Sequence, residues 1–159
     1  MEFTITYFTN IKMAETNNSN TNHLHGGQIL AKALSDQGVE HAFGVPGESF
    51  LALLDGLYDE QHNIQFITCR QEGGAAYMAD AYAKLTGKVG VLMVTRGPGA
   101  SNAMVGVHTA YQDSTPMVVF IGQVNSEMIE REAFQEMDFR HTYSQCAKWV
   151  GSIDRVDRM

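Results

Sequence analysis

The chain has 159 residues, with 11 basic and 18 acidic side chains, a formal net charge of -7 and an isoelectric point near 5.2. An acidic chain without clustered Lys and Arg disfavours nucleic acid as a partner, and no apolar run approaches the ~20 residues of a membrane helix. Hydrophobic residues make up 44% and charged residues 18%, which is typical of one globular domain.

The two cysteines have no CxxC spacing, and the six histidines form no cluster with metal-ligand spacing. This usage favours free thiols in a reducing compartment, so we expect a soluble, cytoplasmic protein. It also predicts no metal site within the chain.

Residues 1–22 are predicted to form a flexible leader, since they show no helical or strand period and end in the polar tract 15–22. The start lacks the basic residues and the cleavage site of a secretory signal peptide. We consider Met13 a candidate alternative start. The folded domain is expected over residues 23–159.

From Gly26 onward, helix and strand patterns alternate along the chain. Short apolar runs predict strands at 41–45, 64–68, 89–95, 117–121 and 147–150. Apolar residues at helical spacing predict helices between Gly26 and Gly38 and at 50–58, 75–85, 100–111 and 134–143. The third and fourth strands are apolar almost throughout, as in parallel strands covered on both faces. The alternation predicts an α/β fold, a doubly wound and mostly parallel sheet with helices on both faces.

A conspicuous segment follows each of the first four predicted strands. These segments are Pro46-Gly47, Arg70-Gln71-Glu72-Gly73-Gly74, Gly97-Pro98-Gly99-Ala100-Ser101-Asn102 and Gly122-Gln123. Ligands of open parallel sheets bind beyond the carboxyl ends of the strands. Each segment alone is common loop sequence, but four of them at one edge predict a shared site.

Glu72 is the most informative residue of this edge, because it stands where a strand gives way to a helix beside two glycines. It either complements the dipole of the helix as an ordinary first-turn acid, or it is buried and shares a proton with a ligand. The Gly97-Pro98-Gly99 turn is similar to the start of a dinucleotide fingerprint, but Asn102 replaces the third glycine. A nicotinamide or flavin nucleotide site is therefore disfavoured.

Five segments resemble, in order and spacing, the motifs of thiamine diphosphate enzymes of the acetolactate synthase and pyruvate oxidase group. They are Phe43–Gly47, Arg70–Ala83, Thr95–Asn102, Gly122–Val124 and Phe134–Asp138. The resemblance runs from about Gly26 to Val150. It implies a pyrimidine-binding (PYR) domain, thiamine diphosphate as cofactor, and decarboxylation and carboligation of 2-oxo acids.

The resemblance also implies roles for single residues. Glu72 corresponds to the catalytic glutamate that hydrogen-bonds the pyrimidine nitrogen of the cofactor and activates its aminopyrimidine. The implied cofactor-binding positions are Val45, Pro46, Glu72, Thr95, Pro98 and Asn102. Gln123 and Gln135 match positions on the substrate side. Arg96 departs from the family, whose usual residue there is a small Ser, so this cation either lies on the surface or changes which acid the site accepts.

Members of this family are several hundred residues long and bind the diphosphate through Mg²⁺ in a separate domain that carries a Gly-Asp-Gly motif, which this sequence lacks. The resemblance therefore implies half a site, completed by the diphosphate-binding domain of a partner subunit in a homo-oligomer. It is also compatible with an FAD-binding site elsewhere in a longer protein. Two alternatives stay open: a separate PYR subunit of a two-chain decarboxylase, and a non-catalytic interaction domain of the same fold.

Overall fold

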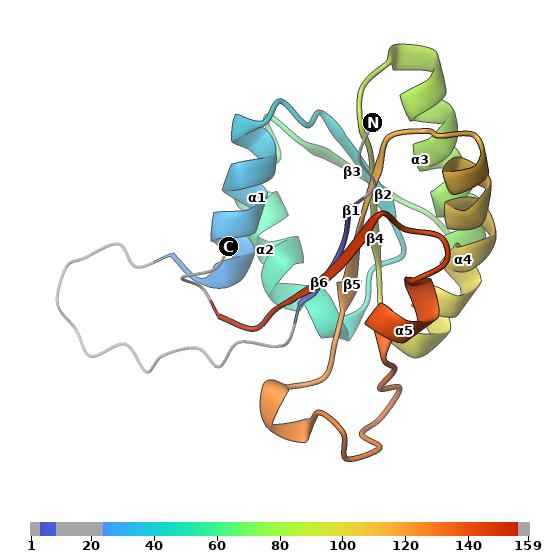
Figure 1. Cartoon of the computed structure of the whole chain (residues 1–159). Coiled ribbons are helices and arrows are strands. Elements are labelled where there is room, and N and C mark those ends of the chain that lie inside the picture. Colours follow the sequence, from blue (N-terminus) through green and yellow to red (C-terminus); the bar gives the residue numbers. More distant parts are fainter. Residues whose placement is uncertain (1–3, 9–23, 156–159) are drawn as a thin grey trace, which may run out of the picture.

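The computed structural model describes residues 4–8 and 24–155, in which six parallel strands form one sheet (Figure 1). The strand order is β3-β2-β4-β5-β1-β6. The strands are β1 Thr4–Phe8, β2 His41–Gly44, β3 Gln65–Thr68, β4 Gly90–Val94, β5 Met117–Gly122 and β6 Trp149–Ile153. The predicted α/β fold with a parallel sheet is confirmed.

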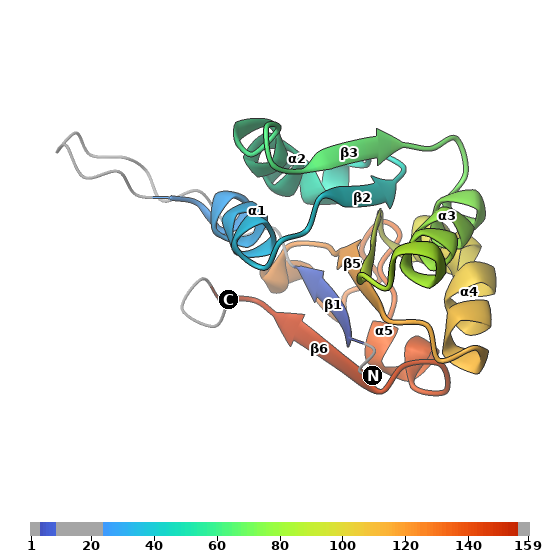
Figure 2. The same ribbon diagram turned by 90° about the horizontal axis from the view of Figure 1, so that it is seen from above.

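Helices cover both faces of the sheet, as Figure 2 shows from above. They are α1 Gly26–Asp36, α2 Leu51–Asp59, α3 Glu72–Thr86, α4 Gly97–Gln112 and α5 Phe139–Tyr143, with short 3-10 turns at Glu48–Phe50 and Ser126–Met128. Strand β4 shows why its sequence is apolar throughout: Val91 and Met93 belong to the hydrophobic cluster under α1 and α2. Leu92 and Val94 belong to the cluster under α3 and α4. Both faces of the strand are therefore buried.

Strand β1 is a correction to the predicted leader. Thr4–Phe8 pairs in parallel with β5 on one side and β6 on the other, so this segment lies inside the sheet. Its β-branched and aromatic residues favour an extended backbone. The prediction of a leader without regular structure is therefore wrong for residues 4–8, while 1–3 and 9–22 lie outside the described residues.

The last helix and strand are shifted from their predicted positions. Helix α5 begins at Phe139 rather than near Phe134, because the side chain of Asp138 caps it by accepting from His141 N at 3.0 Å. Strand β6 spans Trp149–Ile153 rather than 147–150. The longer chain before α5, residues 125–138, is called the connection below.

Both cysteines are free thiols, as expected, and burial raises the pKa of the Cys146 thiol. Within the part of the chain that the structure describes, every helix is too short or too polar to cross a membrane.

Candidate functional site

The strand order reverses between β2 and β4, and the carboxyl ends of these two strands form the topological switch point of the sheet. After β2 the chain forms β3 on one side and then returns to form β4 on the other side of β2. In open parallel sheets such a reversal is where ligands bind. The turns that follow these two strands meet there: the hydroxyls of Ser49 and Thr95 lie 2.9 Å apart. A Cβ on Gly47 would stand 2.6 Å from Thr95 Cβ, so this turn needs glycine.

Glu72 is the first residue of α3 and its side chain is almost fully buried, with the residue 9% exposed. Its Oε2 accepts a hydrogen bond of 3.0 Å from Asn102 Nδ2, which projects from α4. Gln71 caps the helix by accepting from Gly74 N at 2.8 Å. Both sequence interpretations therefore describe part of the observed geometry, since Glu72 starts a helix and is also buried.

The start of α4 packs against the side chain of Glu72. A Cβ on Gly99 would stand 2.8 Å from Thr95 Cγ2 and 3.3 Å from Glu72 Oε1, so only glycine leaves room there. Glu72, Thr95 and Asn102, three of the implied cofactor-binding residues, thus come from different elements and meet at one point. Of the other three residues of this set, which belong to the turns after β2 and β4, Val45 is half-buried and Pro46 and Pro98 are exposed.

These residues fit an aminopyrimidine. One carboxylate oxygen of Glu72 is held by Asn102, and the other faces a backbone that has no side chain at Gly99. A ring nitrogen that shares a proton needs an acid of fixed orientation, which the contact with Asn102 provides. Among the described residues, no group of three or more His, Cys, Asp or Glu is arranged to hold a metal ion.

The two implied substrate-side residues, Gln123 and Gln135, hold the connection against the sheet. Gln123 is 2% exposed, and its amide donates to Met137 O at 2.8 Å and accepts from Val124 N at 3.0 Å. Gln135 has a left-handed backbone with φ 63°, and its carbonyl accepts from Gly97 N at 3.0 Å. A role toward substrate stays a prediction for both, because these contacts are to backbone.

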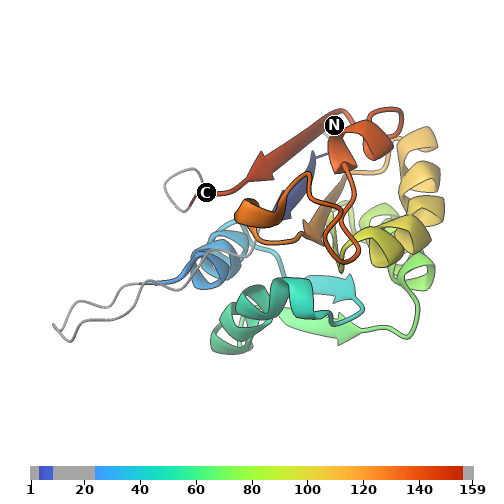
Figure 3. The ribbon, with the colours of Figure 1, turned by 90° about the horizontal axis from the view of Figure 1, so that it is seen from below.

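The connection crosses the carboxyl edge of the sheet and appears in orange in Figure 3, which looks onto this edge. Glu136 organises it by accepting from Glu130 N at 2.5 Å and Ala133 N at 3.0 Å. These amides, that of Glu130 first, hold the pKa of Glu136 below its usual value. Because Gly97 N bonds to Gln135, the connection is fixed directly to the start of α4.

Arg96 is buried, with 8% of its side chain exposed, so the alternative that it lies on the surface is wrong. Its guanidinium forms an ion pair with Glu48 and lies 5.7 Å from the centre of the Phe134 ring. Sequence reasoning missed Glu48 and Ser49 entirely. The sequence does place an acid, Glu48, directly after Pro46-Gly47. This turn follows β2, the neighbour of the strand that precedes Arg96, so an ion pair between the two turns could have been predicted.

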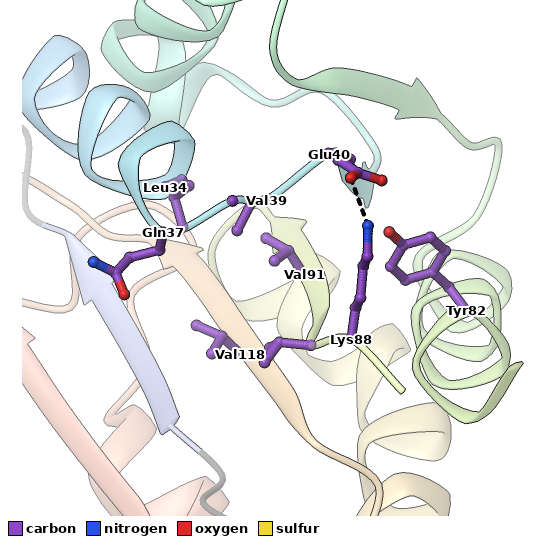
Figure 4. Close-up of a pocket in the computed structure, with 10 residues that line it drawn as sticks. Leu34, Gln37, Val39, Glu40, Tyr82, Lys88, Val91 and Val118 are labelled. Carbon is purple, nitrogen blue, oxygen red and sulfur yellow. Dashed lines mark hydrogen bonds and ion pairs between the residues drawn. The ribbon is translucent and has the colours of Figure 1, made fainter. Parts of the chain in front are cut away.

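A separate cavity of about 500 Å³ lies at the opposite edge of the sheet (Figure 4). Val89 and Val118 line it, whereas Thr95 follows the other end of β4. The ion pair between Lys88 Nζ and Glu40 Oε1, 2.5 Å long, stands at its rim. This cavity is therefore distinct from the site around Glu72.

Comparison with known proteins gives a consistent result. Residues 24–142 match the family described as thiamine pyrophosphate enzyme, N-terminal TPP binding domain. The acetolactate synthase large subunit of Buchnera aphidicola subsp. Acyrthosiphon pisum is 49% identical over 115 residues, which cover 72% of this chain and 20% of that protein. The mitochondrial acetolactate synthase catalytic subunit of Aspergillus candidus is 45% identical over 131 residues, covering 82% and 19%. For the acetolactate synthase isozyme 3 large subunit of Escherichia coli K12, the identity is 46% over 115 residues, covering 72% and 20%. The chain spans about one fifth of the length of these curated relatives.

Proposed function

The chain belongs to the thiamine pyrophosphate enzymes, in the family of their N-terminal TPP binding domain, and from this premise we propose that it holds the aminopyrimidine of thiamine diphosphate for an acetolactate synthase-like enzyme. The reaction would be decarboxylation and carboligation of 2-oxo acids, which makes the whole enzyme a transferase or lyase. The observation that carries the proposal is the buried carboxyl of Glu72, fixed by Asn102 and packed against Gly99 at the start of α4.

Each residue then has a definite task. Glu72 exchanges a proton with the pyrimidine ring nitrogen through the carboxylate oxygen that Asn102 does not hold. Asn102 fixes the plane of that carboxylate. Thr95, hydrogen-bonded to Ser49, joins the turn after β4 to the turn after β2. When bound, the cofactor supplies an electron sink for the bond next to the carbonyl of the 2-oxo acid.

The chain by itself is expected to bind thiamine diphosphate weakly and to turn over no pyruvate. The physical reason is that the residues around Glu72 would contact only the pyrimidine end of the cofactor. Isothermal titration calorimetry with thiamine diphosphate and a pyruvate decarboxylation assay on the purified chain measure both quantities. Robust decarboxylation would refute the half-site proposal. A folded chain that takes up no thiamine diphosphate at millimolar concentration would refute the binding function itself.

We propose that the other half of the site comes from the diphosphate-binding domain of a partner subunit in a homo-oligomer. An exposed apolar stripe on α3 and α4 supports a partner on this side of the sheet. Its members are Tyr77, Met78 and Leu85 of α3 and Val105 of α4. A Cβ on Gly73 would stand 3.0 Å from Val105 Cγ1, so the stripe reaches the start of α3, where Glu72 lies. Large exposed apolar residues gathered on one helical layer are candidates for an interaction site.

Leu85→Glu is expected to weaken self-association, because Leu85 is 88% exposed at the end of the stripe and a charge there opposes burial. Sedimentation velocity over a range of concentrations measures the change. The matched control is Leu51→Glu on α2, also exposed but on the opposite face of the sheet. A wild-type chain that stays monomeric at high concentration contradicts the proposal, and so does equal dissociation of the two variants.

The remaining parts of the proposal concern the whole enzyme. We propose that Mg²⁺ is held by the diphosphate-binding domain, that FAD is admissible elsewhere, and that the enzyme is cytoplasmic. A Gly-Asp-Gly motif fused in frame would identify a single long chain, whereas the same motif in a neighbouring reading frame would identify a two-chain decarboxylase. Cofactor-dependent activity that does not need Glu72 would favour the non-catalytic interaction domain.

A further inference from the structure

Arg96 is the only buried basic residue in the part of the chain that the structure describes. Its partner Glu48 is unlike it, because 71% of the Glu48 side chain is exposed. A buried guanidinium requires an anion nearby, since an unpaired buried charge is very costly. Because the Glu48 carboxylate is already mostly in water, its departure from the ion pair costs Glu48 little free energy. Arg96 is therefore the fixed member of the pair and Glu48 the exchangeable one.

The guanidinium also has a hydrogen-bond donor that no described residue uses. Its Nε is buried and has no hydrogen-bond partner among the described residues. The contact with Glu48 runs from a terminal nitrogen to one carboxylate oxygen. Arginine carries five N–H donors in a planar fork that matches a carboxylate in a bidentate manner. A second mode of carboxylate binding, one that uses Nε as well, is thus open to this side chain.

The position of Arg96 places this free donor beside the proposed cofactor site. Arg96 stands between Thr95, which bonds to Ser49, and Gly97, which bonds to Gln135. Two residues further on, Gly99 lies against Glu72. An anion bound by Arg96 is therefore held at the same carboxyl edge of the sheet as the proposed aminopyrimidine.

We propose that Arg96 binds the carboxylate of the 2-oxo acid, and that Glu48 occupies this position until the acid displaces it. The Phe134 ring, 5.7 Å from the guanidinium, adds a cation–π contact that helps to hold Arg96 in place whichever carboxylate it binds. Arg96 then determines specificity by requiring an anionic substrate. The identity of the acid as a 2-oxo acid rests on the proposed function.

The test follows the Nε–H signal of Arg96 in ¹⁵N NMR spectra of the full chain, titrated with pyruvate and with its neutral ester, methyl pyruvate. Pyruvate is expected to shift the signal and methyl pyruvate is not. Glu48→Gln removes the competing carboxylate and is expected to tighten pyruvate binding about tenfold, which corresponds to about 1.4 kcal/mol. Arg96→Gln is expected to abolish pyruvate binding; for this variant, binding is measured from the chemical shifts of backbone amides. Arg140→Gln, which removes the same charge from an exposed position on α5, should leave binding unchanged.

Equal shifts with both ligands would overturn the proposal, and so would unchanged pyruvate affinity in Glu48→Gln. Tighter binding in Glu48→Gln is a gain that misfolding does not mimic. If Arg96→Gln does not fold, Arg96→Lys keeps the charge but not the fork and is expected to bind pyruvate more weakly than wild type. Titrating the folded variants with thiamine diphosphate separates the two proposals. Cofactor uptake without any pyruvate effect refutes only the role of Arg96, whereas absent cofactor uptake refutes the proposed function.

Discussion

Glu72→Gln is expected to lower cofactor-dependent turnover by about 10²–10⁴-fold in the enzyme that contains this domain, the usual contribution of a positioned acid or base. The amide has the size of the carboxyl and still accepts the hydrogen bond from Asn102, which is 3.0 Å long in the wild-type protein. It does not, however, exchange a proton with a ring nitrogen. Turnover at saturating thiamine diphosphate is therefore the quantity to measure, because binding and packing are largely preserved.

Glu60→Gln is the matched control for this variant. Glu60 also accepts from an asparagine amide, that of Asn63 at 2.9 Å, but it lies at the end of α2, which leads into the start of β3 at the opposite edge of the sheet. It should retain wild-type turnover. Retained turnover in Glu72→Gln, with a wild-type circular dichroism spectrum, would contradict the catalytic assignment and leave Glu72 as a helix-dipole partner only.

The sequence predicts the layout of the site because that layout follows from alternation and from strand ends. Continuous apolar runs such as Val89–Thr95 predict parallel strands buried on both faces, and β4 has that burial. The turns that follow the strands then meet at one edge of the sheet. Several motifs in register led to the family, which the match over residues 24–142 confirms.

Contacts that depend on side-chain placement were beyond the sequence. Periodicity does not distinguish a surface arginine from the buried Arg96, because its contacts are with Glu48 and Phe134, which are distant along the chain. The five residues of β1 are too short a run to outweigh the polar tract that follows them, and only pairing with β5 and β6 identifies them as a strand. The left-handed backbone of Gln135, which no helical pattern reveals, interrupts the helix expected from Phe134, so that α5 starts only after the Asp138 cap.

The contact between Glu72 and Asn102 also depends on how closely α3 and α4 approach each other, since Glu72 lies on one helix and Asn102 on the other. Gly106 sets this distance: a Cβ there would stand 2.4 Å from Ala76 Cβ and 3.0 Å from the Ala76 carbonyl carbon. These atoms belong to the facing backbone and its first side-chain carbon, so no rotamer change relieves the clash. The two helices would have to move apart.

Gly106→Ala is therefore expected to destabilise the chain by about 1–3 kcal/mol through overpacking, although alanine gains up to about 1 kcal/mol of intrinsic helix propensity over glycine. Urea unfolding followed by circular dichroism measures the free energy of unfolding. The control is Gly74→Ala on α3, where an added Cβ meets only Gln71 Oε1 at 4.0 Å and stability should not fall. Thiamine diphosphate affinity should fall in Gly106→Ala alone, because separated helices pull Asn102 away from Glu72. Equal stability and equal affinity in the two variants would show that the approach of α3 to α4 does not set the geometry of the acid.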